Sequence, residues 1–186
     1  KYEREAVKAW AKKRTTVSPR PSRPAASPLE RNIRRAEANI VNQEHETAVI
    51  FDKRGNQLLN VDGAADAVTF TQEQYNQFSG NILTHNHPDN RSFSPVDIDM
   101  LQTSGLEQIR VVTPEYVYYA EATGRPAGYG DINMRYRIAT TSKQDKYFDL
   151  IESGKMTAAQ ARAELSHEVW EEIAARVNIK YWREPR

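Results

Sequence analysis

The stretch "ILTHNHPDNRSFSPVDIDML", residues 82–101, reads as a strand, a polar loop and a helix in succession, and the other predicted elements are arranged around it. Its first residues are apolar and β-branched, as is typical of strands. Ser94 and Pro95 form a helix start, because serine caps a helix N-terminus and proline suits the first helical position. Two of the chain's four histidines lie where the strand gives way to the loop. The stretch therefore predicts two imidazoles at a strand end, followed by a helix.

Upstream of this stretch the sequence predicts a helix and then a hairpin. Ser27, Pro28 and Glu30 make up a helix-start signature. Residues 47–52 and 57–63 are short apolar runs separated by a turn that contains glycine, as in a β-hairpin. A further short strand is predicted over residues 67–70, and a short helix over residues 71–78.

Downstream, residues 108–114 and 115–122 are rich in valine and tyrosine, which predicts two consecutive strands. A helix is predicted over residues 142–154. A longer helix begins at Thr157, which forms a capping box with Gln160. An apolar stripe at every fourth position gives that helix a buried face: Ala161, Leu165, Val169, Ile173 and Val177. The alternation of strands and helices predicts a mixed α/β fold.

Length and charge predict one core with appendages. The chain of 186 residues is expected to divide into a basic arm with a Pro-rich linker (1–28), a central domain (29–125) and a C-terminal helical extension (126–186). Residues 1–36 carry eleven Lys/Arg against three Asp/Glu, whereas residues 41–123 carry four against twelve. The basic arm could contact the phosphates of a nucleic acid, but the carboxylates of residues 41–123 would repel them. Nucleic acid is therefore the less favoured partner.

Several classes of protein are excluded by composition. No apolar run is long enough to cross a bilayer and no secretory signal is recognisable, which predicts a soluble protein, cytoplasmic or delivered as part of a larger one. The absence of an initial methionine suggests a processed chain or a piece of something longer, and we expect a module of a longer polypeptide. The chain has no cysteine, so a bound metal must be held by histidine and carboxylate. His167 lacks the second histidine of a zincin helix, and we interpret it as a surface or partly packed residue.

The two histidines predict a metal site. His85 and His87 project to the same face of a strand, because side chains alternate with period two. Catalytic zinc takes three protein ligands and leaves one position open, so the third ligand should be a carboxylate. Asp97, in the first turn of the following helix, is the leading candidate.

The string "HNHPDNRSFSPVD", residues 85–97, resembles the motif of the JAMM/MPN (JAB) metalloproteases, and especially their RadC-like bacterial branch. His85, His87 and Asp97 match its zinc ligands. Glu46 in "HETAVIF" matches its upstream glutamate, and Ser94 its serine. The resemblance implies a curved mixed β-sheet flanked by helices. It also implies that Glu46 acts as general base and then acid, and that Ser94 donates to the oxyanion.

What the resemblance implies about function is a zinc-dependent hydrolase that cleaves peptide or isopeptide bonds by metal-activated water. Its substrate would be a peptide or a protein, with ubiquitin-like modifiers as one class, since members of the family remove such modifiers. JAB domains also occur as modules in bacterial and phage proteins, including toxins. Two alternatives stay open, namely a catalytically silent MPN-like interaction module and a DNA-associated RadC-like protein.

Alternatives also exist for individual residues. Only six residues separate His87 from Ser94 where the family pattern has seven, so Asp99 is the fallback for the third ligand. Glu44 lies on the same pleat face as Glu46 and is the alternative base. Helix capping alone explains a serine and an acid at this spacing, but it does not explain the two histidines that precede them.

Overall fold

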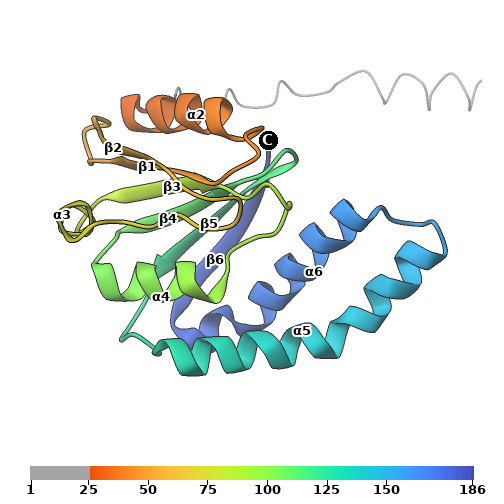
Figure 1. Cartoon of the computed structure of the whole chain (residues 1–186). Coiled ribbons are helices and arrows are strands. Elements are labelled where there is room, and N and C mark those ends of the chain that lie inside the picture. Colours follow the sequence, from red (N-terminus) through yellow and green to blue (C-terminus); the bar gives the residue numbers. More distant parts are fainter. Residues whose placement is uncertain (1–25) are drawn as a thin grey trace, which may run out of the picture.

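The structure is a computed structural model that describes residues 26–186 of the chain. The arm predicted for residues 1–28 therefore lies almost entirely outside the described residues. The described part is built on a six-stranded sheet with the order β2-β1-β3-β4-β5-β6 (Figure 1). The strands are β1 (Thr47–Phe51), β2 (Gln57–Asp62), β3 (Ile82–Asn86), β4 (Gln108–Val112), β5 (Tyr116–Ala122) and β6 (Ile179–Pro185).

The pairing makes the sheet mixed, and the predicted α/β class is confirmed. β1 and β2 form the predicted antiparallel hairpin, whose turn contains Gly55 at a φ of 90°. A positive φ suits glycine because it has no Cβ. β3 runs antiparallel to β1 and parallel to β4, and the parallel connection passes through helix α4 (Pro95–Ser104). The strand with the two histidines therefore lies in the interior of the sheet.

Helices cover both faces of the sheet (Figure 1). Helix α2 (Pro28–Ile40) covers one face, and its Ile33 packs in a cluster with Val49 and Val112 of the strands. The other face carries α4, α5 (Tyr129–Glu152) and α6 (Ala158–Ile173). The larger core cluster lies there and includes Leu83 and Trp170. Two short helices complete the described chain: α3 (Gln72–Tyr75) and a 3-10 turn (Ala174–Val177).

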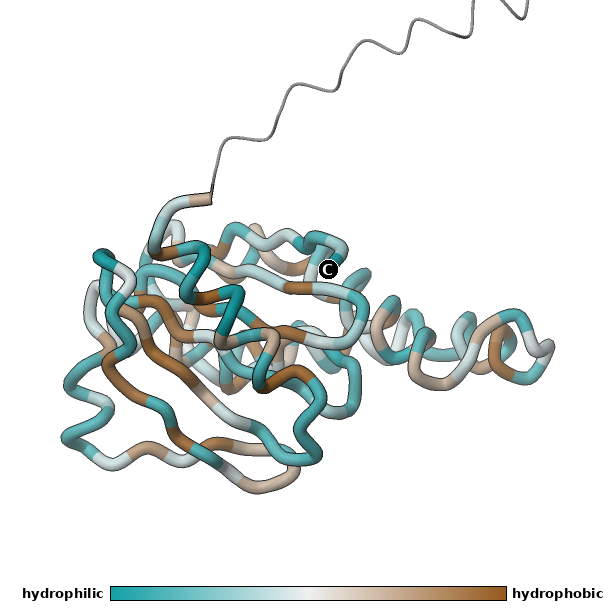
Figure 2. The backbone as a smooth tube through the Cα atoms, turned by 90° about the horizontal axis from the view of Figure 1, so that it is seen from above, coloured by the Kyte–Doolittle hydropathy of each residue, from teal (hydrophilic) through white to brown (hydrophobic). Residues whose placement is uncertain are grey.

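The prediction for the start of α5 was wrong. The helix begins at Tyr129, immediately after Gly128 at a φ of 78°, rather than near Ser142. The hydroxyl of Ser142 donates to the carbonyl of Ala139 within the same helix, so it is not a cap. The long helix is favoured instead by packing, since Ala139 is buried. α5 and α6 form a hairpin that projects beyond the sheet, as seen from above in Figure 2.

Two further differences concern strands. Residues 67–70 do not form the predicted strand, because Val68 and Phe70 pack against the core without pairing in the sheet. The sequence analysis missed β6, which lies in the segment predicted as a helical extension and pairs with β5. The rings of Tyr119 and Trp182 stack across these two strands at 5.0 Å between centroids. Among residues 26–186, none of the helices combines the length and apolarity needed to cross a membrane.

Candidate metal centre

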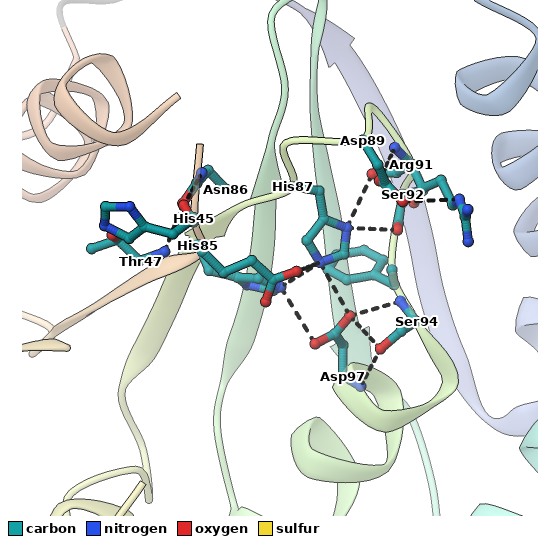
Figure 3. Close-up of polar contacts among 12 residues, drawn as sticks. His45, Thr47, His85, Asn86, His87, Asp89, Arg91, Ser92, Ser94 and Asp97 are labelled. Carbon is teal, nitrogen blue, oxygen red and sulfur yellow. Dashed lines mark hydrogen bonds and ion pairs between the residues drawn. The ribbon is translucent and has the colours of Figure 1, made fainter. Parts of the chain in front are cut away.

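His85 lies in β3 and His87 directly follows the strand, and both project to one face of the sheet (Figure 3). Strand alternation directs them toward α4, together with Leu83 of the large core cluster. Thr84, directly before His85, points the other way and donates its hydroxyl to Glu37 of α2. Both imidazoles are buried, with 3% and 6% of the residues exposed. The predicted common direction of the two histidines is confirmed.

Asp97 reaches the histidines from the first turn of α4. Ser94 is the N-cap of that helix and forms a capping box with Asp97. The Asp97 carboxylate accepts from the Ser94 backbone N–H at 2.7 Å and from the Ser94 hydroxyl at 2.8 Å, both at Oδ2. Capping thus fixes the side-chain rotamer of Asp97. The same rotamer serves a helix cap and would serve a metal ligand.

The three side chains converge. The Nε2 atoms of His85 and His87 are 3.1 Å apart. His85 Nε2 lies 3.3 Å from Asp97 Oδ1, and His87 Nε2 lies 3.7 Å from Asp97 Oδ2. One ligand atom from each residue can be chosen so that all three lie within 4.8 Å of one another. This buried group could hold a metal ion, and its members are also ion-paired with one another.

The tautomer of His87 suits a ligand. Its Nδ1 lies 3.0 Å from the carbonyl oxygen of Ser92 and 3.2 Å from that of Arg91. Carbonyl oxygens only accept hydrogen bonds, so Nδ1 carries the proton and neutral His87 presents a lone pair at Nε2. This is the arrangement by which outer partners orient metal-binding histidines. His85 Nδ1 is buried and has no hydrogen-bond partner among the described residues.

Two carboxyl groups at the site have opposite pKa shifts. Burial alone would raise the pKa of Asp97, but the attraction of His85 and His87 in their protonated forms and the hydrogen bonds to the carboxylate hold it well below its usual range. Burial raises the pKa of Glu46 to about 7, against a lowering by the charge of His87. A carboxylate that stays ionised beside a carboxyl group near neutrality is a common pairing at catalytic centres.

Glu46 makes the contact with the histidines, with Oε1 3.5 Å from His87 Nε2. Its backbone extends the hairpin pairing beyond β1, because Gly63 N donates to Glu46 O at 2.8 Å. Glu44 is exposed and only lines the adjoining groove. Asp99 lies outside the three-residue group. The geometry thus favours Glu46 and Asp97 over the two alternatives left open by sequence.

Ser94 has its hydroxyl committed to Asp97. The oxygen accepts from the Asp97 backbone N–H at 3.3 Å, while its proton points to Asp97 Oδ2 at 2.8 Å. A hydroxyl has one proton to donate. In this arrangement Ser94 supports the Asp97 carboxylate, and it would have to turn its proton away from Asp97 to donate to a substrate oxygen.

The group lies in a groove of about 670 Å³. Apolar side chains form much of its lining, and acidic side chains lie along it. The apolar members include Val68, Phe70, Phe93, Val96 and Met100, and the acidic members include Glu44, Asp66 and Asp89. A groove of this size is within the usual range of ligand-binding sites.

The sequence analysis missed Asn86, the residue between the two histidines. Its side-chain oxygen accepts from the Thr47 backbone N–H at 2.7 Å, and its amide donates to the His45 carbonyl at 2.9 Å. These bonds tie the start of β1 to the end of β3 and hold Glu46 beside His87. The signal that could have identified Asn86 is a polar side chain on the strand face opposite the two histidines. His167, predicted to be surface or partly packed, is partly packed, with 12% of its side chain exposed.

Comparisons with protein-family models, with curated proteins and with solved structures found no match to the chain. The resemblance to the JAMM/MPN family therefore stays a prediction from the sequence motif.

Proposed function

We propose that the protein is a zinc-dependent hydrolase that cleaves peptide or isopeptide bonds. The observation that carries the proposal is the convergence of His85, His87 and Asp97, with Glu46 3.5 Å from one of the imidazoles. Capping explains the position of the aspartate, but it does not explain two buried imidazoles whose Nε2 atoms face each other at 3.1 Å.

The donor set fits zinc. Two imidazole nitrogens and one carboxylate oxygen are the ligand types of catalytic zinc sites that leave a position open, and the chain has no thiolate to offer. The protonated Nδ1 of His87 directs the Nε2 lone pair into the group. Zinc held there would supply Lewis-acid polarisation of a carbonyl and a lowered pKa for water.

The chain's own residues account for the proton transfers. Glu46, whose pKa is raised to about 7, is suited to take a proton from water near neutral pH and to deliver it to the leaving amine nitrogen. Asp97 stays ionised across the working pH range, because its pKa is held low. Ser94 keeps that carboxylate oriented through its backbone N–H and its hydroxyl.

The substrate in this proposal is an extended peptide or a protein tail lying in the groove. Its apolar side chains could receive substrate side chains, and water access is limited at the buried group. The sequence resemblance adds the ubiquitin-like modifiers as a specific class to test. It also suggests that the chain acts as a module of a longer phage, bacterial or toxin protein.

The test begins with the metal. Elemental analysis of the purified protein, after reconstitution with zinc and removal of excess, should give about one zinc per chain. His85→Ala and His87→Ala should abolish binding, since each removes one of the three ligands. A reconstituted protein without zinc would exclude the hydrolase and leave the catalytically silent module.

Activity is tested separately, with quenched fluorescent peptides and ubiquitin conjugates as substrates. Glu46→Gln should keep the zinc and lose hydrolysis by at least about 100-fold, the lower contribution expected of a general base. Glu44→Gln is the matched control, because Glu44 lines the same groove without contacting His87. Equal activity in the wild type and in Glu46→Gln would overturn the assignment of the base.

A further inference from the structure

Helix α6 holds the backbone of the loop between His87 and the start of α4. We call His85, His87 and Asp97 the metal group. This ligand loop, residues 88–93, runs from His87 to Ser94. Three side chains spaced by four residues, Arg162, Ser166 and Trp170, lie along one face of α6 and bond to the loop. The bonds are Arg162 Nε to Asp89 O (3.0 Å), Ser92 N to Ser166 Oγ (2.9 Å) and Trp170 Nε1 to Phe93 O (2.8 Å).

Ser92 hydrogen-bonds both to the C-terminal elements and to a histidine of the metal group. The residue is buried, with 1% exposed, and each of its polar groups has a partner. Its N–H donates to Ser166 of α6, and its hydroxyl lies 3.1 Å from the hydroxyl of Tyr181 on β6. Its carbonyl accepts from His87 Nδ1 at 3.0 Å. Ser92 therefore connects the C-terminal elements to one imidazole through a single residue.

The roles of these atoms follow from their hydrogen-bonding capacity. The Ser166 hydroxyl donates its one proton to Ala163 O at 3.1 Å within α6, so it meets Ser92 N as an acceptor. The Ser92 N–H lies in the same peptide plane as the Arg91 carbonyl, whose oxygen is 3.2 Å from His87 Nδ1, so the bond to Ser166 orients that plane. The bond to Tyr181 holds the side chain of Ser92, the residue whose own carbonyl accepts from His87 Nδ1. The two carbonyls in turn set the ring plane of His87 and the nitrogen that carries its proton.

We infer that Ser166 of α6 and Tyr181 of β6 are positioning residues for the metal group, acting through Ser92 on the orientation of His87. The inference rests on the metal site of the proposed function. It assigns the C-terminal segment a part in zinc binding, although no residue of that segment belongs to the three-residue group. Without these bonds the carbonyls that face His87 Nδ1 are held less firmly, and so is the His87 ring.

A merely structural role for the same bonds predicts a different result. If they only fasten α6 to the sheet, their loss lowers the free energy of unfolding and leaves the zinc affinity of the folded protein unchanged. Positioning predicts weaker zinc binding, because changes in the outer partners of metal ligands typically cost 10- to 100-fold in affinity. It also predicts altered coordination geometry in the folded protein.

The experiment compares Ser166→Ala and Tyr181→Phe with Ile173→Val. The first two each remove one hydroxyl that holds Ser92. Ile173→Val trims a buried side chain of the same helix, 1% exposed, and leaves those hydroxyls in place. Zinc affinity is measured by competition with a chromophoric chelator at fixed pH, on samples shown to be folded by circular dichroism. Absorption spectra of the cobalt(II)-loaded proteins report ligand geometry.

We expect zinc binding about 10-fold weaker or more in Ser166→Ala and Tyr181→Phe, with shifted cobalt(II) bands. Ile173→Val should match the wild type in both measurements. Tyr181→Phe serves as the second variant if Ser166→Ala does not fold. Wild-type zinc affinity and spectra in the hydroxyl variants would overturn this inference and leave the proposed function intact. A wild type that binds no zinc would overturn both.

Discussion

Asp97 is both the acidic member of the capping box of α4 and a proposed ligand, and two substitutions can separate these roles. Ser94→Ala removes the capping hydroxyl, which accepts from Asp97 N and donates to its carboxylate, but keeps the carboxylate. Asp97→Asn keeps an amide oxygen that can accept from the Ser94 N–H, but removes the charge. Loss of a capping side chain costs about 1 kcal/mol, and exchange of a charge-assisted hydrogen bond for a neutral one costs about as much.

The two variants should therefore have similar stability without metal and different affinity for zinc. Each should lower the free energy of unfolding by about 1 kcal/mol, or roughly 2–4 °C in melting temperature for a domain of this size. Asp97→Asn loses a ligand and should bind zinc more than about 100-fold more weakly. Ser94→Ala loses only an outer partner, and should lose about 10-fold, the low end for such changes.

The assay is thermal unfolding of the wild type and both variants after chelation, and again with zinc. A ligand present at 100 times its dissociation constant stabilises by about 2.7 kcal/mol, which raises the melting temperature of the wild type and of Ser94→Ala. Asp97→Asn should gain little at the same zinc concentration. If zinc stabilises Asp97→Asn as much as Ser94→Ala, Asp97 is a cap and no ligand, and the proposed metal site is wrong.

Three further outcomes are expected. Arg110→Met should lower the free energy of unfolding by about 3–5 kcal/mol, because it leaves buried Glu37 without the guanidinium 3.8 Å away. Denaturant titration measures this loss, and adding Glu37→Gln to the same protein should recover most of it. Burial raises the pKa of Glu37. Its contribution to stability is therefore complete below about pH 4.3 and is lost as the pH rises through its pKa in the folded protein. Glu37→Gln should gain stability relative to the wild type between pH 4 and 8, and equal pH dependence of the free energy of unfolding in the two proteins would contradict this. Trp170→Phe should cost about 1–3 kcal/mol in the same titration, because it leaves the buried carbonyl of Phe93 without its donor.

Much of the candidate site could be predicted from sequence because its geometry is local. His85 and His87 share a strand face through period-two alternation, and Asp97 follows from the helix start at Ser94. The partners that orient the site could not be predicted, because they come from far along the chain. Ser166 meets Ser92 across 74 positions, and no local pattern marks that pairing.

The elements of the fold also differ in whether a local sequence signal marks them. Strong local signals, such as the hairpin around Gly55 and the capping box at Thr157, correspond to elements of the structure. The start of α5 at Tyr129 was missed because Gly128 is a weak N-cap that makes no side-chain hydrogen bond. β6 was missed because its residues follow a helix and a 3-10 turn without a strong turn signal. It is defined by pairing with β5, which is a tertiary interaction.

The order of elements along the chain has a consequence for how the molecule is made. His85, His87 and Asp97 are translated well before α6 and β6, whose side chains hold Ser92. During vectorial synthesis the histidines leave the ribosome while their supporting helix is still unmade. If the chain binds zinc as proposed, it is expected to acquire the ion after translation. A nonsense mutation upstream of α6 should then yield a chain that carries the whole HNHP string and yet binds zinc poorly.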